Sequence, residues 1–571
     1  TGLVEDPRIG LDLQQALEHA DLVRKLLERA ALHAALLEQM LDVGARGRRV
    51  LGGLDGIAAQ IALIRRDGGE LGEHGQQRTP LFLGLEAVHE QAEQASGQAL
   101  ATGLARLQVG HLEEGRGIAR VRLEQLEPDA LDAIGVASAE ALFDDIPLHA
   151  RFPDLELPPA ISDIELERTF RRLSQRNVTL DDGPSFLGAG CYRHFIPATV
   201  DYVLQRGEFY TSYTPYQPEL SQGMLQAMFE YQSMICRLTG MEVSNASHYD
   251  GATSLAEAAL LALDEAGTNR SRIILSPAVH PHYRDVVATY LSGTQASLIG
   301  PEDTTLSAAD LVGKVCEETA ALVIQTPNFF GYLEDLNGIA EKVHARGALL
   351  IVLVDPIMLG LFQPPGSYGA DIVVADGQSL GIAPSFGGPS VGIFATRRAY
   401  IRRLVGRLVG KTTDVEGQRG YVLTLATREQ HIRRAKATSN ICTNSALGAL
   451  AAATYLATLG RQGLRQVAEL CYHKSHYAAV RIAALPRCSV NPVTPERPFF
   501  KEFSVELPLP AAEVNQALQK EFGIIGGYDL GRSYPAMTNR LLIAATEMNP
   551  REEIDRLVEA LEQITASSAV R

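Results

Sequence analysis

The stretch Asp250-Gly-Ala-Thr-Ser-Leu-Ala-Glu257 decides how this chain folds, and it predicts the start of a helix. Ser254 and Glu257 have the S-x-x-E spacing of a capping box, and an alanine- and leucine-rich run follows them. Gly251 can adopt a left-handed backbone, so that the hydroxyls of Thr253 and Ser254 face the open amides of the first turn. Such a helix start can hold a phosphate or another anion. A capped, buried helix without a ligand fits the same residues, so the downstream sequence has to decide.

Short apolar runs alternate with helical patterns between residues 250 and 400. The apolar runs predict strands at 272–275, 321–325, 348–354, 371–374 and 390–394. Helices are predicted in several of the gaps, for example at 310–318 and 337–345. Buried, continuous strands separated by helices are typical of a mainly parallel α/β sheet. Ligands of such sheets bind at the carboxyl ends of the strands.

Polar residues follow three of these predicted strands. His280 comes after the first strand, Asn328 after the second and Asp355 after the third. Together with the helix start quoted above, this order resembles the cofactor site of the fold-type I pyridoxal phosphate enzymes. In that class the helix start holds the phosphate, a ring stacks on the pyridine, an Asn touches the ring hydroxyl, and an Asp keeps the ring nitrogen protonated, which makes the ring a better electron sink. The resemblance implies a cofactor cup made of Gly251, Thr253, Ser254, His280, Asn328 and Asp355.

The lysine that should hold such a cofactor is missing. The strand at 371–374 leads into Asp376-Gly-Gln-Ser-Leu-Gly-Ile-Ala-Pro-Ser-Phe-Gly-Gly-Pro389, which contains no lysine. An amine nucleophile is required to hold pyridoxal phosphate covalently. Lys411 lies beyond the next predicted strand and cannot serve without rerouting the fold. This chain alone is therefore not expected to be a working pyridoxal enzyme, which argues against a free-standing enzyme with an unexpected lysine. The lysines of the chain are Lys25, Lys314, Lys342, Lys411, Lys436, Lys474, Lys501 and Lys520.

A pyridoxal-enzyme pattern without its lysine points to one family. The motifs that carry the resemblance are Phe186-Leu-Gly-Ala-Gly190, Tyr213-Thr-Pro-Tyr-Gln-Pro-Glu219 with Ser221-Gln-Gly223, Asn245-Ala-Ser247, Pro364-Pro-Gly-Ser-Tyr-Gly-Ala-Asp-Ile372, Gln378-Ser-Leu-Gly-Ile382, Phe386-Gly-Gly-Pro389 and the block from Thr427 to Thr443. On these motifs, the chain resembles the first (alpha, or N-terminal) subunit of the two-subunit glycine decarboxylase, the P-protein of the glycine cleavage system. The resemblance runs from about Leu126 to the C-terminus and leaves out residues 1 to about 120.

The resemblance implies a subunit that keeps the pyridoxal-enzyme fold but lacks the lysine. Pyridoxal 5'-phosphate is then expected on a beta subunit that carries the lysine, and not covalently on this chain. Together the two subunits would decarboxylate glycine and pass the aminomethyl group to the lipoyl arm of the H-protein, as a glycine dehydrogenase (aminomethyl-transferring) with an α2β2 assembly. The alternative is a catalytically inert scaffold or regulatory subunit of the same complex that contributes no site residue.

A tyrosine-rich segment, 210–219, precedes the helix start. Two of its residues are prolines, and each proline forces the preceding residue into an extended conformation, so a stiff loop and not a helix is predicted. Tyr213, Tyr216 and Glu219 are the candidates for a contribution to the shared active site, where they would orient the substrate or the lipoyl arm. A loop that only seals the subunit interface is an equal alternative, because aromatic side chains are good interface anchors.

Four other patterns carry weaker signals. The cation-rich block 427–443 could receive a carboxylate or an acidic partner such as the H-protein, although a solvated helix face or an interface ion-pair set is favoured. Arg540 stands where fold-type I enzymes bind a substrate carboxylate, but a structural arginine is the preferred interpretation. His280-Pro-His282 lacks a third metal ligand, so no metal site is predicted. Gly188-Ala-Gly190 lacks the third glycine of a dinucleotide loop.

Composition limits the partners and the compartment. With 52 basic and 68 acidic residues the net charge is −16, which disfavours nucleic acid or an anionic membrane as main partner. No apolar run approaches the roughly 20 residues of a membrane helix. The six cysteines contain no C-x-x-C pair and indicate reduced, mostly buried thiols. Because the start also lacks a signal-peptide pattern, a cytoplasmic location is expected.

Four segments are predicted along the chain. Residues 1–120 form a helical or disordered extension of unknown role, or equally upstream sequence read through from a misplaced start. Residues 121–184 form an arm whose helix, 162–176, turns Ile164, Leu166 and Phe170 inward. The large pyridoxal-transferase-like domain covers 185–452, and a smaller C-terminal α+β domain covers 453–571. The elements predicted in that last domain are helices at 453–459, 464–480 and 550–564 and strands at 503–507 and 541–544.

Overall fold

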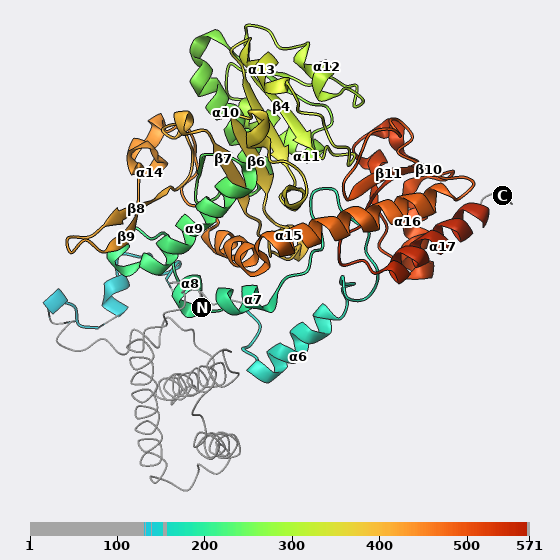
Figure 1. Ribbon diagram of the computed structural model, residues 1–571. Coiled ribbons are helices and arrows are strands. Elements are labelled where there is room, and N and C mark those ends of the chain that lie inside the picture. Colours follow the sequence, from blue (N-terminus) through green and yellow to red (C-terminus); the bar gives the residue numbers. More distant parts are fainter. Residues whose placement is uncertain (1–130, 132, 139, 152–156, 568–571) are drawn as a thin grey trace, which may run out of the picture. The chain divides into compact units, whose positions relative to one another are not determined.

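The computed structural model describes residues 131, 133–138, 140–151 and 157–567, so the predicted extension at 1–120 lies outside the described residues. The chain divides into two compact units, Thr1–Arg168 and Thr169–Arg571 (Figure 1). The described part of the first unit holds the 3-10 helix η2 (Glu140–Phe143) and the start of helix α6 (Asp163–Ser174). The three apolar side chains of α6 predicted to turn inward, at positions 164, 166 and 170, are all exposed.

The second unit is built on a seven-stranded sheet in the order β1-β7-β6-β5-β4-β2-β3. Strands β2 to β6 pair in parallel, and β7 runs antiparallel to both of its neighbours. The strands are β1 (Val243–Ser244), β2 (Arg272–Leu275), β3 (Ser297–Ile299), β4 (Thr319–Thr326), β5 (Leu349–Val354), β6 (Ile372–Asp376) and β7 (Gly392–Thr396). The predicted mainly parallel α/β fold is therefore confirmed, and each of the predicted strands is present within two residues of its bounds. The short strands β1 and β3 were not predicted.

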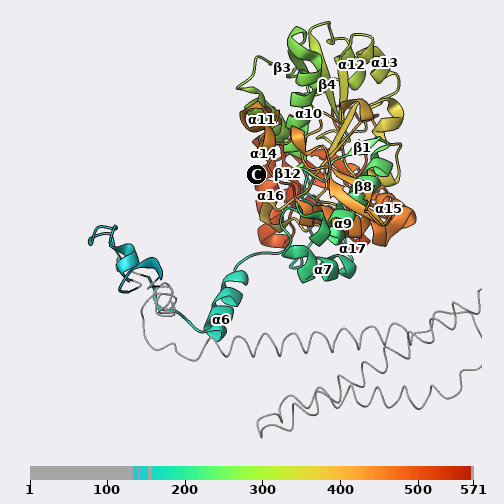
Figure 2. The same ribbon diagram turned by 90° about the vertical axis from the view of Figure 1, so that its left-hand side faces the viewer.

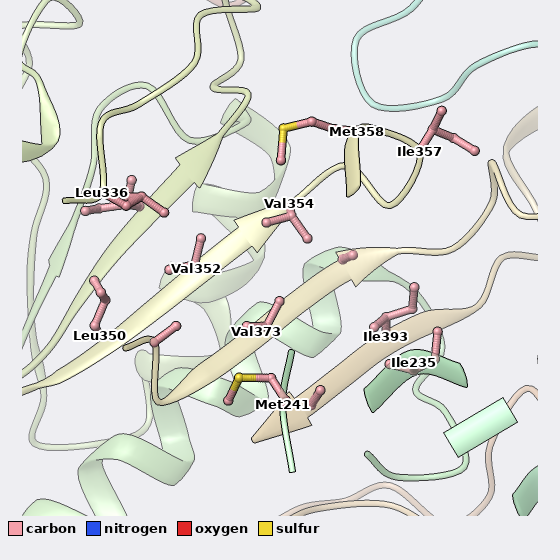
Figure 3. Packing of buried hydrophobic residues seen from close by; sticks show 14 of the residues in the cluster. Ile235, Met241, Leu336, Leu350, Val352, Val354, Ile357, Met358, Val373 and Ile393 are labelled. Carbon is pink, nitrogen blue, oxygen red and sulfur yellow. The ribbon is translucent and has the colours of Figure 1, made fainter. Parts of the chain in front are cut away.

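Alternate side chains of each central strand enter two different hydrophobic clusters. On β5, Leu350, Val352 and Val354 pack in one cluster, whereas Ile351 and Leu353 pack in the other. Figure 3 shows the first cluster, where Val352 and Val354 lie near side chains of β6, β7 and α9. The first cluster is covered by α9 (Gln222–Thr239), α12 (Ala308–Val312), α13 (Ile339–His344) and α15 (Ala446–Ala483), and the second by α10 (Gly251–Ala266) and α11 (Pro281–Leu291).

Burial on both faces explains the unbroken apolar runs of the central strands. Figure 2 shows α11 and α13 on opposite sides of β4. Helix α12 ends at Val312, earlier than the predicted helix at 310–318.

Helix α10 begins at Gly251, inside the stretch predicted to start a helix but four residues before the start that the predicted Ser254–Glu257 box implies, because a different capping box starts it. Asp250 is the N-cap: its Oδ1 accepts a hydrogen bond from the Thr253 amide at 2.8 Å, and Thr253 Oγ1 accepts one from the Asp250 amide at 3.3 Å. The predicted Ser254–Glu257 box is wrong. Ser254 Oγ donates to the Asp250 carbonyl, and Glu257 is buried, accepting a hydrogen bond from Ser439. The sequence contains two overlapping capping patterns, Asp250 with Thr253 and Ser254 with Glu257. The Asp250 carboxylate, one residue before the helix, forms the cap.

A smaller antiparallel sheet, in the order β10-β11-β13-β12, forms a separate core with α16 (Ala511–Phe522) and α17 (Arg551–Ser567). Its strands are β10 (Ser489–Val490), β11 (Glu502–Glu506), β12 (Tyr528–Asp529) and β13 (Arg540–Ala544). Figure 1 shows α15 running from the large sheet to this part, and its residues enter both cores. Gly460, at φ 59° and ψ −173°, interrupts α15 between the two helices predicted there.

A hairpin of β8 (Val409–Thr413) and β9 (Arg419–Leu423), which was not predicted, extends from the large part. Two further expectations can be compared with the described residues. Among the described residues, no helix is long and apolar enough to cross a membrane. The six cysteines are free thiols, but the expectation that most are buried is wrong, because only Cys471 is fully buried.

Candidate functional site

A cavity of about 50 Å³, called the cleft below, lies at the carboxyl ends of β4, β5 and β6. This is the edge of the sheet where a ligand was predicted to bind. Both parts of the second unit contribute to its wall. Residues that line the cleft include Tyr192, His280, Tyr283, Asp355, Asp376, Gln378, Lys501 and Glu502.

Asp355, the predicted partner of a pyridinium nitrogen, already pairs with a cation of this chain. Lys501 Nζ lies 2.6 Å from Asp355 Oδ2, and the two side chains are only 2% and 11% exposed. The ammonium also lies 3.5 Å from the ring centroid of Tyr192 and 3.2 Å from His194 Nε2. Lys501 immediately precedes β11, so the part of the chain around the smaller sheet supplies a positive charge where a cofactor ring would supply one.

The predicted phosphate cup is occupied in a similar way. Asp376, at the end of β6, accepts a hydrogen bond from the Gly251 amide at 3.0 Å through Oδ2, and from the Gln378 amide at 2.9 Å through Oδ1. The hydroxyls of Thr253 and Ser254 do not face this position, because both donate to the Asp250 carbonyl. A carboxylate of the chain therefore takes the anion position at the start of α10.

Close packing seals this helix start. A Cβ atom at Gly251 would lie 2.6 Å from the Tyr283 hydroxyl and 2.8 Å from the Asp376 amide, so only glycine fits. Burial raises the pKa of the Asp376 carboxyl, while hydrogen bonds from Ser390 and the Gly251 amide act in the opposite direction. Burial is also the main cause that raises the pKa of Tyr283.

His280 lies at the cleft as predicted, in a neutral form. Its Nε2 donates to the Ala189 carbonyl at 2.8 Å, and its Nδ1 accepts from the His282 amide at 3.2 Å, a tautomer assigned from these partners. Burial lowers the pKa of His280 to about 4. The ring cannot turn freely, because Phe329 and Tyr283 lie 4.8 and 4.9 Å away between ring centroids.

Asn328 does not line the cleft. Its Nδ2 donates to Glu334 Oε1 at 2.9 Å, and its Oδ1 accepts from the amides of Phe330 and Tyr332 at 3.0 and 3.2 Å. Asn328 thus stabilises the turn after β4. Of the predicted cup residues, His280 and Asp355 line the cleft. Gly251 contacts Asp376, which also lines it, through its backbone amide.

A buried polar chain, which the sequence did not reveal, continues from the cleft into the domain junction. Beyond Lys501, His194 Nδ1 lies 2.8 Å from Glu547 Oε2, and Cys471 Sγ lies 3.4 Å from the same oxygen. Burial raises the pKa of Glu547, but the hydrogen bond and charge of His194 outweigh it and lower the value to about 2. His194, Cys471 and Glu547 lie close enough to share a metal ion, yet the Lys501 ammonium against His194 disfavours a cation there.

The tyrosine loop joins α8 (Gly207–Tyr210) to α9 and, apart from the 3-10 turn η3 (Pro218–Leu220), is irregular, as predicted. Tyr213 and Tyr216 are 77% and 53% exposed, and Glu219 is exposed as well. None of these three residues lines the cleft. Tyr216 is anchored, because its hydroxyl accepts a hydrogen bond from Arg407 Nη2 at 2.8 Å.

Arg540 is likewise outside the cleft and pairs with Glu506 at 3.2 Å, which fits the structural role preferred from the sequence. The two glycines of Gly188-Ala-Gly190 serve packing: Ala189 donates its amide to Glu502 Oε1 at 2.6 Å, and a Cβ at Gly190 would lie 3.1 Å from the His280 ring. This stretch therefore forms part of the cleft wall, where Gly190 is a lining residue.

The residues present do not fit pyridoxal phosphate. A phosphate at the start of α10 would meet the Asp376 carboxylate, and a pyridinium ring at Asp355 would meet the Lys501 ammonium. The cleft, at about 50 Å³, is also far below the roughly 300 Å³ at which ligand pockets begin. Lys501 lies at the cleft, but its ammonium is already used in the ion pair with Asp355.

The fold is that of the fold-type I pyridoxal-dependent enzymes, which are among the solved structures that resemble this chain. The model of the glycine cleavage system P-protein family matches residues 120–561, and the chain belongs to that family. The match leaves out the predicted extension at 1–120.

This chain aligns with nearly the whole length of its relatives of known sequence. The "Probable glycine dehydrogenase (decarboxylating) subunit 1" of Thermomicrobium roseum is 55% identical over 439 residues, which is 76% of this chain and 97% of the relative. The protein of the same name from Desulforamulus reducens is 50% identical over 438 residues, with the same coverage.

Solved structures agree with these relatives. The crystal structure of glycine decarboxylase (P-protein) of the glycine cleavage system, in inhibitor-bound form, has a TM-score of 0.70 and 44% identity over 80% of this chain and 100% of that chain. A sphingosine-1-phosphate lyase of Burkholderia pseudomallei, at 17% identity and a TM-score of 0.51 over 74% of this chain and 97% of that chain, shares the fold alone.

Proposed function

We propose that this chain is the non-lysine subunit of glycine decarboxylase. With a lysine-bearing beta subunit it would decarboxylate glycine and transfer the aminomethyl group to the lipoyl arm of the H-protein, in an α2β2 assembly. The family match and the relatives named glycine dehydrogenase (decarboxylating) subunit 1 support this proposal, since that name implies a second subunit. Pyridoxal phosphate, held by the beta subunit, would supply the electron sink for the decarboxylation.

One observation supports the proposal that the other subunit holds the cofactor. Both charged positions of the cofactor site are filled by this chain's own side chains, Lys501 against Asp355 and Asp376 against the Gly251 amide. A subunit closed in this way is suited to support the complex without holding the cofactor. Its contribution to the reaction must then come from surfaces that face the partner.

The tyrosine loop is the proposed contribution. Tyr213 and Leu220 expose 77% and 78% of their surface, and Tyr210 and Tyr216 in the same segment expose 59% and 53%, so the loop offers several exposed apolar side chains for a partner to cover. In this proposal Tyr213 and Glu219 orient glycine or the lipoyl arm at the shared site. Tyr216 would hold the loop in place through Arg407 and also reach the site with the exposed part of its ring.

The first experiment treats the purified chain with pyridoxal phosphate and borohydride and measures its mass. We expect no stoichiometric adduct, and glycine turnover only after the lysine-bearing subunit is added. Peptide mapping of any adduct should examine Lys501 first, because Lys501 lies at the cleft and is the lysine most able to trap the aldehyde there. A stoichiometric adduct on one lysine, together with turnover by the chain alone, would contradict the proposal.

A second experiment separates a contributing subunit from an inert scaffold. In the assembled complex, Tyr213→Phe removes only a hydroxyl and Glu219→Gln removes only a charge, so both should leave the assembly intact. We expect turnover to fall by a factor of ten or more, toward the roughly 100-fold effect of a lost proton-transfer or positioning group. The exposed Glu559→Gln, on α17, is the control. Unchanged turnover, with native mass spectrometry still showing the α2β2 mass, would favour the scaffold.

A further inference from the structure

A second cavity, of about 140 Å³, lies away from the cleft and shares none of its lining residues. It is bounded by the segment 402–406 and by parts of the cation-rich block 427–443. Its wall is rich in positive charge although the whole chain carries a net charge of −16. The residues that could contact a ligand there are Arg402, Arg403, Arg428, Arg433, Thr438 and Ser439.

Arg428 is the centre of this cavity wall. One of its terminal nitrogens donates to the Leu404 carbonyl. Its Nε and Nη2 atoms are sealed from solvent and have no hydrogen-bond partner among the described residues. A buried donor without a partner costs about 1–3 kcal/mol, and more when the group is charged. Two donor nitrogens of Arg428 therefore lack a hydrogen-bond acceptor among the described residues.

Two carboxylates, Asp264 and Glu429, also line the cavity, and each pairs with another arginine. Glu429 is buried and pairs with Arg407, which is itself 1% exposed, and the other oxygen of Glu429, Oε1, has no hydrogen-bond partner among the described residues. Arg403 pairs with Asp264 and Glu265 at 3.1 and 2.9 Å. The positive charges of Arg407 and Arg403 thus have counter-charges, whereas that of Arg428 has none.

Two further arginines are available beside it. The side chains of Arg402 and Arg433 make no hydrogen bond or ion pair within the part of the chain that the structure describes, and both are exposed at the rim. Burial and then the charge of Arg407 lower the pKa of Arg428 to about 10. The Arg428 guanidinium therefore remains charged at neutral pH.

We propose that this cavity binds a small phosphate-type oxyanion, held by Arg428 with help from Arg402 and Arg433. Guanidinium groups bind phosphate through paired, charge-assisted hydrogen bonds, and the hydroxyls of Thr438 and Ser439 can donate to further oxygens. A dianion matches several uncompensated cations better than a single carboxylate does. The volume is close to the roughly 150 Å³ of a cavity that holds benzene, so the site suits a small ion and not a cofactor or a peptide.

The site also has a physical link to the tyrosine loop. Glu429 lines the cavity and pairs with Arg407, and Arg407 in turn donates to the Tyr216 hydroxyl. His431, next in the block, packs edge-on against Tyr216 at 5.6 Å between ring centroids. The proposed site is separate from the cleft, because the two cavities share no lining residue.

The test titrates the full chain with inorganic phosphate by calorimetry at constant ionic strength set with chloride. We expect saturable binding of one phosphate per chain. Arg428→Gln should weaken it about tenfold or more, which corresponds to the loss of one charge-assisted contact of roughly 1.4 kcal/mol. Arg433→Gln, at an exposed position where misfolding is not expected, should weaken it several-fold. The exposed Arg461→Gln on α15 is the matched control and should bind as the unchanged chain does.

Three results would overturn the proposal. Phosphate could fail to saturate in the millimolar range. It could bind equally well to the Arg433 and Arg428 variants, which would place it elsewhere. Acetate or succinate could saturate the site while phosphate does not, which would make the ligand a carboxylate. Each result leaves the borohydride experiment on the cleft unaffected, so failure here is distinguishable from failure of the proposed function.

Discussion

Replacing Lys501 by Met should destabilise the chain strongly, because it leaves the Asp355 carboxylate buried without its cation. Met keeps most of the length and apolar volume of the lysine, so the change isolates the charge. Asp355 has two further acidic groups in the same cleft, Asp376 and Glu502, and burial raises the pKa of both carboxyls. Removing one partner of a buried ion pair costs about 3–5 kcal/mol. We expect a loss in that range in the free energy of unfolding.

The assay is urea denaturation followed by circular dichroism, since the chain has no tryptophan. The set comprises Lys501→Met, Asp355→Asn and the double variant. Because the two residues are in contact, the double variant should be less destabilised than the sum of the single variants by about 2 kcal/mol or more. Lys520→Met, an exposed lysine on α16, should stay within about 0.5 kcal/mol of the unchanged chain. A cost below about 1 kcal/mol for Lys501→Met, or strict additivity, would refute the view that this pair closes the cleft.

Two other perturbations follow from buried groups. Burial raises the pKa of Glu257 from 4.5 to about 7. Within that pH window the unfolded chain releases the proton and the folded chain keeps it, so the free energy of unfolding should fall by about 3 kcal/mol as pH rises. Glu257→Gln should flatten this decline between about pH 4.5 and 7 in denaturation curves, and an unchanged slope would contradict the assignment. Gly331 and Gly338 both have positive φ, but only at Gly331 would a Cβ clash, 2.0 Å from the Glu502 carbonyl oxygen. Gly338→Ala should therefore cost about 1–2 kcal/mol, the backbone term alone, and Gly331→Ala clearly more; equal losses would show that the clash is relieved.

The sheet could be predicted from the sequence because its strands are buried on both faces. Such strands read as unbroken apolar runs, and the pattern at 348–354 needs no knowledge of its neighbours. The edges were harder. The strands β1 and β3 are two and three residues long, too short to show a pattern, and they form because a neighbouring strand offers free backbone groups. The break in α15 was visible in advance because Gly460 separates two helical patterns.

The sequence predicted where the cleft lies, but not all of the residues that line it. Its location follows from strand order, and His280 and Asp355 follow from the strand ends. Lys501 could not be assigned, because it comes from a different part of the chain and meets Asp355 only after the small domain has packed. Its one local sign is that Lys501 and Glu502 are enclosed by phenylalanines in the run Phe499-Phe-Lys-Glu-Phe503. Asn328 was wrongly assigned to the cleft, because its side chain forms hydrogen bonds with nearby backbone amides in the turn after β4.

The way the cleft is closed bears on how a subunit can exist without its cofactor. If a pyridoxal enzyme lost its Schiff-base lysine, and with it the cofactor, the buried Asp355 would have no cation and the first amides of α10 would have no acceptor. Both unpaired groups would be costly. In this chain Lys501 and Asp376 satisfy these two groups, so folding requires no ligand. The thermal midpoint of the isolated chain should therefore not change when pyridoxal phosphate is added. A ligand that binds the folded state at 100 times its dissociation constant would stabilise it by about 2.7 kcal/mol, a shift that thermal denaturation would detect. Such a shift, lost on changing a residue of the cleft, would mean that the cleft opens to admit the cofactor.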